Sequence, residues 1–247
     1  MKALVLAAGY ATRLHPLTRD RPKPLLEVGG APLLSHILER LLALPELSQV
    51  VVVGNARFAP QLRAWAEGFR SPVPLRVLDD GSSDDSNKLG AVGDIDFALR
   101  EMPLAGEDLV VVAGDNLLGF DLRPLAAAFR ARRRPQLAVR ELALPPGPSP
   151  YNEVELDARG RVLHFREKPA RPRTPLAAIA LYFFPPEVEG LVTRYLAEGG
   201  NPDAPGHFIA WLVTQTDVYA ERFEGEWWDI GSLEALESAR ARFLGSA

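Results

Sequence analysis

Short, continuous apolar runs alternate with amphipathic stretches through the first half of the chain, and this alternation constrains the fold more than any other feature. The apolar runs are residues 3–8, 50–54, 75–78 and 109–113. The stretches with helical spacing are residues 33–44, 58–69, 90–100 and 122–131. A strand that is apolar along its whole length is buried on both faces, which is typical of a parallel sheet covered by helices. The pattern predicts an α/β fold with a Rossmann-like, mixed, mostly parallel sheet flanked by helices.

The spacing of apolar residues changes after the proline-rich segment 145–148. Shorter, more alternating segments follow, and we expect strands of a mixed sheet at residues 153–156, 162–167 and 177–184. Helical spacing returns in residues 186–197, 208–213 and 233–244. Since these elements can extend the sheet of the first half, we predict one domain over residues 1–247, divided into residues 1–145 and 146–247.

Composition narrows the ligands and partners of the chain. With 28 basic against 32 acidic side chains and a net charge of -4, there is no global field to hold a polyanion, so we expect no nucleic-acid partner. The absence of cysteine removes thiolate metal ligands and leaves oxygen donors for a hard metal. The apolar run 3–8 is too short for a signal peptide or a membrane span, which favours a cytoplasmic protein without a membrane partner. The sequence leaves open whether the chain forms a homo-oligomer.

The loop after the first apolar run carries the features of a phosphate-binding turn. Residues 9–14 (GYATRL) follow a buried strand, so their backbone N–H groups can point at an anion. Arg13 offers a planar guanidinium to phosphate oxygens, and Lys23 is a point charge between Pro22 and Pro24, which stiffen its backbone. A single glycine turn after a strand is usually only a turn, but the two placed cations favour a phosphate site.

Two aspartates occupy positions where a metal ion can be held. Asp115 follows the apolar run 109–113, at the carboxyl edge of the predicted parallel sheet, where open α/β folds bind their ligands. Asp229 lies beside two tryptophans in residues 226–231 (EWWDIG), and such an aspartate is by itself more often a turn or cap residue. Magnesium is usually held by one or two carboxylates together with substrate phosphates.

Several stretches, taken together, closely resemble one family: residues 6–18 with 22–25, residues 114–116 (GDN), residues 166–169 (REKP) and residues 226–231. They resemble the sugar-phosphate nucleotidylyltransferases, or NDP-sugar pyrophosphorylases, including glucose-1-phosphate thymidylyltransferases. The resemblance implies that Arg13 binds the β and γ phosphates of a nucleoside triphosphate and that Lys23 binds the reacting phosphates. It also implies that Asp115 and Asp229 coordinate Mg²⁺. Residues 1–145 are expected to form the nucleotide-binding half and residues 146–247 the sugar-binding half.

The resemblance assigns further residues to each substrate. Glu167 is expected to bind the sugar and Lys168 its phosphate, while Tyr151, Asn152 and Trp227 are expected to line the sugar site. The expected contacts of the nucleotide are Leu6, Ala7, Ala8, Gly9, Thr12, Arg13, Lys23 and Gly90.

The sequence departs from the family pattern at a few positions. Ala11 stands where a second glycine is more common, and alanine would be strained there if that position needs a positive φ. Asn152 replaces a glycine of the sugar pocket, and residues 79–90 lack the glutamine that reads the base in thymidylyltransferases. The identities of the sugar and of the base therefore stay open.

The resemblance implies a Mg²⁺-dependent reaction of a nucleoside triphosphate with a sugar 1-phosphate to give an NDP-sugar and pyrophosphate. Arg13, Lys23, Asp115 and Lys168 are the expected catalytic residues. One alternative is a cytidylyltransferase acting on an amino-alcohol phosphate such as phosphocholine, which would need an aromatic and acidic cage. Another is a non-catalytic nucleotide sensor of the same fold, which the joint presence of these residues disfavours.

Overall fold

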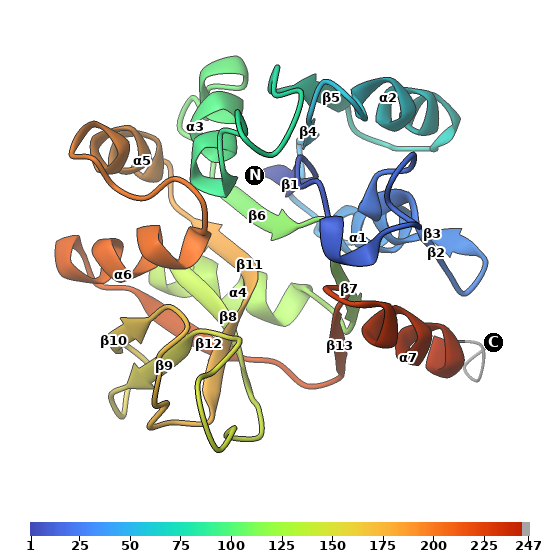
Figure 1. The fold of residues 1–247 in the computed structure, drawn as a ribbon. Helices are drawn as coiled ribbons and strands as arrows, with labels where there is room; N and C mark the ends of the chain where they lie inside the picture. Colours follow the sequence, from blue (N-terminus) through green and yellow to red (C-terminus); the bar gives the residue numbers. More distant parts are fainter. Residues whose placement is uncertain (244–247) are drawn as a thin grey trace. The chain divides into compact units, whose positions relative to one another are not determined.

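The computed structural model describes residues 1–243 of the chain, and the predicted helix end at Leu244 lies outside the described residues. The chain divides into two compact units that alternate along the sequence (Figure 1). Unit 1 comprises residues 1–89, 112–123 and those from 225 onward, and unit 2 comprises residues 90–111 and 124–224. The single domain with two halves meeting near residue 145 stays a prediction.

Unit 1 is built on parallel strands covered by helices. Strand β4 (Gln49–Gly54) pairs in parallel with β1 (Lys2–Leu6) on one side and with β5 (Leu75–Asp79) on the other, and Val50–Val53 are fully buried. The other elements of unit 1 are β2 (Glu27–Val28), β3 (Ala31–Pro32), α1 (Leu33–Leu42), α2 (Ala59–Gly68), β7 (Asn116–Gly119), β13 (Glu226–Asp229) and α7 (Leu233–Phe243). The predicted parallel strands of this unit are confirmed, each within two residues of its expected ends.

Unit 2 has a mixed strand arrangement. Strand β8 (Gln136–Glu141) pairs antiparallel with β11 (Leu176–Phe184) and parallel with β12 (Tyr219–Arg222), while β9 (Glu153–Leu156) and β10 (Val162–Arg166) form an antiparallel hairpin. The helices of unit 2 are α3 (Ala91–Glu101), α4 (Arg123–Arg132, whose first residue belongs to unit 1), α5 (Val188–Ala197) and α6 (Pro205–Gln215). Strand β6 (Leu109–Ala113) carries the chain from unit 2 into unit 1.

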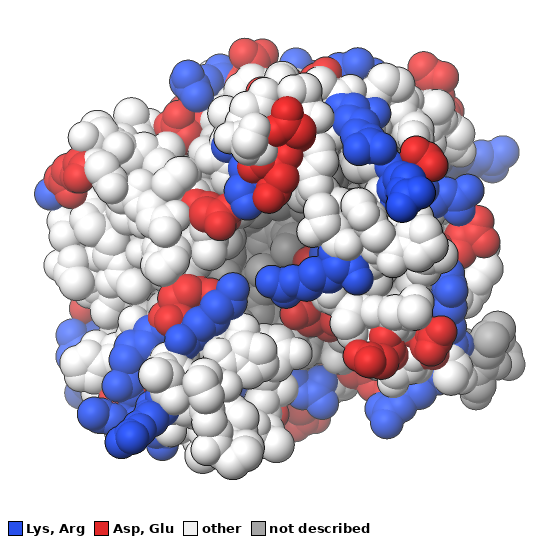
Figure 2. Space-filling model, in the orientation of Figure 1, with Lys and Arg blue, Asp and Glu red and all other residues white. Residues whose placement is uncertain are grey.

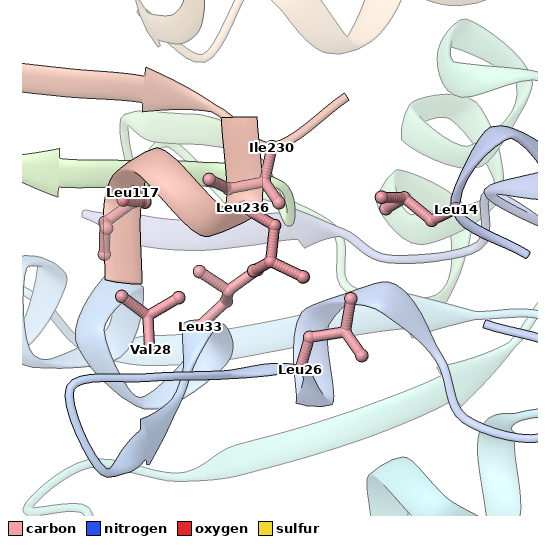
Figure 3. Packing of buried hydrophobic residues seen from close by; sticks show 8 residues of the cluster. Leu14, Leu26, Val28, Leu33, Leu117, Ile230 and Leu236 are labelled. Carbon is pink, nitrogen blue, oxygen red and sulfur yellow. The ribbon is translucent and has the colours of Figure 1, made fainter. Parts of the chain in front are cut away.

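A buried apolar cluster in unit 1 joins segments from both ends of the chain. Figure 3 shows how Leu14 and Leu26, from the N-terminal loops, share this cluster with Ile230 and Leu236 of the C-terminal segment. Ala11 and Trp228 pack against it from its edge. The opening loop is therefore held in place partly by residues more than 200 positions away.

Both signs of charge are present on the surface, and some of the charges pair with one another. On the face drawn in Figure 2, basic and acidic side chains are interspersed. Of the helices within residues 1–243, none combines the length and the apolar character that a bilayer span requires. Arg132 and Arg133 of the basic run 130–134 lie 2.6 Å from Glu221 and Asp108 respectively, so these two arginines make ion pairs within the protein.

The backbone at Ala11 leads to a stability prediction. Ala11 has φ 49° and ψ 41°, the left-handed region that glycine adopts without strain and that costs alanine about 1–2 kcal/mol. Its carbonyl accepts hydrogen bonds from Thr18 Oγ1 at 2.8 Å and from Leu14 N at 3.0 Å, which hold this conformation. We expect Ala11→Gly to raise the free energy of unfolding by about 0.5–1 kcal/mol, because relief of backbone strain outweighs the loss of one half-buried methyl group. Denaturant unfolding measures this change.

Ala105→Gly is the matched control, since Ala105 is also left-handed, with φ 52°, but is exposed and is not part of the cluster. It should gain about 1 kcal/mol, with no methyl packing to offset the gain. A decrease in stability for Ala11→Gly alongside a gain for Ala105→Gly would contradict the strain assigned to Ala11.

Candidate functional site

The loop after β1 is anchored by a fully buried asparagine. Asn55 follows the last residue of β4, and its side-chain Nδ2 donates to Ala8 O at 2.7 Å while its Oδ1 accepts from Phe58 N at 3.0 Å. Ala7 N donates to Val53 O at 2.8 Å. The expected nucleotide contacts Leu6, Ala7, Ala8 and Gly9 thus lie on backbone that is fixed from β4. At Gly9 a Cβ would meet no atom within 4 Å, so this backbone faces open space.

A second contact holds the same loop from the end of β5. The Tyr10 hydroxyl lies 3.2 Å from Ser82 Oγ, and both the backbone N and the Oγ of Ser82 donate to Asp80 Oδ1 at 2.7 Å. Burial raises the pKa of Tyr10, so its hydroxyl keeps its proton for this contact. Thr12 and Arg13 follow on an exposed turn of 3₁₀ helix, Thr12–Leu14.

An ion pair joins the two predicted phosphate- and metal-binding segments. Lys23 Nζ lies 2.6 Å from Asp115 Oδ2, with only 16% and 29% of the two side chains exposed. The chain reaches this geometry because Gly114 N donates to Leu6 O at 2.8 Å, an approach so close that a Cβ on Gly114 would lie 2.8 Å from that oxygen. A residue with a side chain in place of Gly114 would therefore clash with Leu6 O.

Strand β13 brings the second predicted metal ligand to the same place. Asp229 is the register partner of Asn116, and Ile230 N donates to Asp115 O at 3.0 Å. Trp227 Nε1 donates to the buried Asn116 Oδ1 at 2.9 Å, so Asn116 orients the tryptophan. The structure thus brings together the backbone at Asp115 and Asp229 and the pair formed by Lys23 and Asp115.

The donor chemistry of this place suits a hard cation. Within residues 1–243 there is no group of three or more His, Cys, Asp or Glu side chains that could hold a metal ion by itself. Two carboxylates on hydrogen-bonded neighbouring segments are, however, the set that Mg²⁺ uses when substrate phosphates and waters complete its octahedron. Asp115 and Asp229 therefore fit Mg²⁺ better than a metal that needs a complete protein cage.

The predicted sugar-binding pair lies in unit 2, directly after β10. Glu167 is 14% exposed, and a Cβ on Gly206 would overlap its Oε2, so its carboxylate lies against the start of α6. Lys168 has a left-handed backbone, with φ 44°, and its side chain is 60% exposed, with Nζ 4.0 Å from Glu167 Oε1. Burial, followed by the Glu167 carboxylate, raises the pKa of Tyr182 well above its ordinary range, so Tyr182 stays neutral beside Glu167.

Asn152 has a structural use that the sequence does not reveal. Its Nδ2 donates to Ala178 O at 2.8 Å, and its Oδ1 accepts from Ala178 N at 2.7 Å. This pair of hydrogen bonds holds β11 at the point where its pairing with β8 shifts register, between Ala178 and Tyr182. Neighbouring Tyr151 is exposed and lines a cavity of about 130 Å³ with Leu142, Leu144 and several prolines.

Gly90 also has a packing role, at the start of α3. It has φ 80°, and a Cβ there would overlap the carbonyl oxygen of Pro202. Ala91 N and Val92 N donate to the carbonyls of Asp203 and Pro202 at 3.1 and 2.8 Å. Its contact with the nucleotide stays a prediction.

Three buried residues support the site without having been assigned a role from the sequence, although Asn116 lies within the motif at residues 114–116. Asn55, Ser82 and Asn116 are buried polar residues, and each makes hydrogen bonds to a loop or to a predicted site residue. A signal for Asn55 is present in the sequence, since it directly follows the apolar run 50–54, at the carboxyl edge of a strand. Ser82 lies in a polar loop and carries no comparable signal.

Comparison with known proteins decides the family. The model of the family described as nucleotidyl transferase matches residues 2–245. The chain belongs to the nucleotidyl transferase family. The family resemblance expected from the sequence motifs is thereby confirmed.

Two curated relatives of this nucleotidyl transferase carry named activities. Glucose-1-phosphate thymidylyltransferase of Streptomyces antibioticus is 31% identical over 94% of this chain and 63% of its own length. UTP--glucose-1-phosphate uridylyltransferase of Synechocystis sp. is 29% identical over 94% of this chain and 61% of its own length. The chain therefore spans less than two thirds of the length of these relatives.

A solved structure supports the fold of the family member. The crystal structure of a UDP-glucose pyrophosphorylase complexed with UDP-glucose matches 100% of this chain and 99% of its own with a TM-score of 0.83 at 20% identity. The expected α/β fold with a mixed, mostly parallel sheet flanked by helices is confirmed.

Asn55 gives the site a stability prediction. We expect Asn55→Ala to lower the free energy of unfolding by about 2–3 kcal/mol, because Ala8 O and Phe58 N both lose a buried partner. The control is Asn87→Ala, since the Asn87 side chain also makes two hydrogen bonds to the backbone, both accepted by its Oδ1, but in an exposed loop. The control should cost about 0.5 kcal/mol or less. Equal decreases in the free energy of unfolding of the two variants, measured with urea, would show that Asn55 stabilises the protein no more than an exposed asparagine does.

Proposed function

We propose that this chain joins a nucleoside triphosphate to a sugar 1-phosphate, releasing an NDP-sugar and pyrophosphate, with Mg²⁺ as cofactor. The observation that carries the proposal is the Lys23–Asp115 pair at 2.6 Å, with the backbone of the Asp229 strand bonded to Asp115. A cation and a carboxylate held together beside an open glycine turn suit a site for charged phosphates. The names of the two curated relatives support the choice of glucose 1-phosphate as the first sugar phosphate to test.

The chemistry asks for control of charge more than for proton transfer. An oxygen of the sugar phosphate attacks the α-phosphorus in line, a new P–O bond forms, and the bond to the bridging oxygen breaks with its electron pair leaving on pyrophosphate. Both reactants are anions and repel each other. We assign Lys23 to the reacting phosphates, Lys168 to the sugar phosphate and the exposed Arg13 to the departing pyrophosphate.

Asp115 and Asp229 would hold the magnesium ion. When bound, Mg²⁺ would withdraw charge from phosphate oxygens as a Lewis acid. Asp115 has a second task, since its Oδ2 accepts from Lys23 Nζ and keeps that ammonium in place before substrate arrives. Such preorganisation lowers the cost of arranging charges during the reaction.

The substrate-binding part of the proposal extends to unit 2. We assign Glu167 to sugar hydroxyls because its carboxylate is held against Gly206 and only 14% of its side chain is exposed. Trp227, oriented by Asn116, is assigned to the sugar site, as are Tyr151 and Asn152. The cytoplasmic location stays a prediction.

The experiment that tests the function is a matrix of reactions monitored by pyrophosphate release. The common nucleoside triphosphates are combined with several sugar 1-phosphates and with phosphocholine, with magnesium and then with chelator. Magnesium-dependent release with a sugar phosphate supports the proposal and identifies both substrates. Release only with phosphocholine would identify the cytidylyltransferase, and nucleotide binding without any release would identify the non-catalytic sensor.

The metal assignment has its own variant. We expect Asp115→Asn to lower kcat by about two orders of magnitude or more, because the amide keeps the shape but loses the anionic ligand. Asp121→Asn is the control, since Asp121 is an exposed carboxylate that pairs with Arg123. Thermal unfolding checks that both variants fold, and near-normal turnover of Asp115→Asn at saturating magnesium would refute the assignment.

A variant of Lys168 tests whether this residue binds the sugar phosphate and not the nucleotide. We expect Lys168→Ala to raise the KM for the sugar phosphate by about tenfold, with a smaller change in the KM for the nucleotide, because a phosphate loses one charged partner. Arg171→Ala removes an exposed cation from the same loop and should leave both constants within about twofold. A larger effect of Lys168→Ala on the nucleotide would contradict this division of roles.

A further inference from the structure

A buried carboxylate lies beneath the loop that carries Glu167 and Lys168. Glu153 is the first residue of β9 and only 2% exposed. Its Oε1 accepts three hydrogen bonds, from Arg166 Nη2 at 2.8 Å, from Arg173 N at 2.7 Å and from Thr174 N at 2.9 Å. In the described part of the chain its other oxygen, Oε2, has no hydrogen-bond partner. The three hydrogen bonds that offset the cost of burying this charge are therefore all accepted by one oxygen atom.

The three donors lie at the two ends of one loop. Arg166 ends β10, and Arg173 and Thr174 come just before β11, so Glu153 Oε1 connects the beginning and the end of the segment 166–174. Thr174 Oγ1 adds a hydrogen bond to Val154 O at 2.8 Å, which fixes the same end to β9. We call residues 166–174 the clamped loop.

Lys168 needs such support because its backbone is strained. Its φ of 44° lies in the left-handed region, which a residue with a side chain adopts only when the surrounding structure enforces it. Its own side chain offers little restraint, since it is 60% exposed and its Nζ lies 4.0 Å from Glu167 Oε1. Fixing both ends of the clamped loop supplies part of that restraint, and a hydrogen bond from Ser149 N to Pro169 O at 3.0 Å supplies another part.

The identity of the side chain at position 153 follows from this geometry. Two backbone N–H groups and one guanidinium converge there, and a carboxylate oxygen can accept all three. An apolar residue would leave the two N–H groups without these hydrogen bonds. Glu155, two residues further along β9, is less buried, and among the described residues no comparable set of donors converges on it.

We propose that Glu153 is a positioning residue that clamps the loop 166–174 and thereby presents Lys168 to the phosphate of the sugar substrate. This inference rests on the proposed function for the role of Lys168. Glu153 itself touches no substrate and acts through the position of the loop. Loss of the clamp should therefore weaken one substrate selectively.

The first test uses Glu153→Gln, which keeps the size of the side chain and one acceptor oxygen but removes its charge. We expect the KM for the sugar 1-phosphate to rise about five- to tenfold and the KM for the nucleoside triphosphate to stay within about twofold. Glu155→Gln is the matched control and should change neither constant by more than twofold. A sugar KM unchanged in Glu153→Gln, in an active enzyme, would overturn the inference and leave the proposed function intact.

A double-mutant cycle separates positioning from general stabilisation. If Glu153 acts through Lys168, then Glu153→Gln added to Lys168→Ala should change the sugar KM by less than twofold. A residue that only stabilises the fold would have the same effect in both backgrounds. If the fold-change in the sugar KM of the double variant equals the product of the two single fold-changes, the inference is overturned.

Hydrogen exchange tests the clamp without any substrate. Amide exchange within residues 167–174 should be at least tenfold faster in Glu153→Gln than in the parent protein and unchanged in Glu155→Gln. Arg166→Lys, which keeps the cation but loses the planar fork, covers the case in which Glu153→Gln does not fold, and it should show a smaller acceleration in the same segment. Unchanged amide exchange in this segment would refute the clamp. Inactivity of the parent protein with every substrate pair would instead refute the proposed function, and the exchange experiment would still test the clamp.

Discussion

The ion pair between Lys23 and Asp115 is the interaction on which the candidate site depends. It joins residues 92 positions apart, and beside it Gly114 N donates a hydrogen bond to Leu6 O at 2.8 Å. Ile230 N, next to Asp229, donates to Asp115 O, and Trp227 Nε1 donates to Asn116 Oδ1. A single close backbone approach thus sets a cation and two carboxylates on neighbouring segments before any ligand is bound.

Most of the regular elements could be predicted from apolar periodicity. Strand β6 and strand β9 begin and end where the sequence pattern places them, because both are short apolar or alternating runs bounded by turns. Strand β8 was not predicted, since it begins with the polar Gln136 after an arginine run and Pro135, although Gln136 is only 1% exposed. Pairing between segments such as β7 and β13 is a tertiary event that leaves no periodic signal in either short strand.

The candidate site shows the same division between local and long-range information. Lys23, Asp115 and Asp229 could be singled out because each lies in a motif with a chemical reason for its residue type. Asn55 and Glu153 could not be recognised as supports, since their partners, Ala8 and the loop 166–174, approach them only in the folded chain. The hydrogen bonds of Asn152 to Ala178 are a further example, because a residue chosen for its place in a pocket motif has a clear use in joining strands.

The alternation of the two units along the chain has a consequence for the order in which the protein can be made. Unit 1 takes its strands β1, β4 and β5 from the start of the chain but its strand β13 and helix α7 from residues after 225. A ribosome releases unit 2 in full before it releases Ile230 and Leu236, which complete the apolar cluster around Leu14 and Leu26. The nascent loop with the predicted phosphate ligands must therefore wait, with its apolar side chains incompletely covered, until residues 230–236 have emerged.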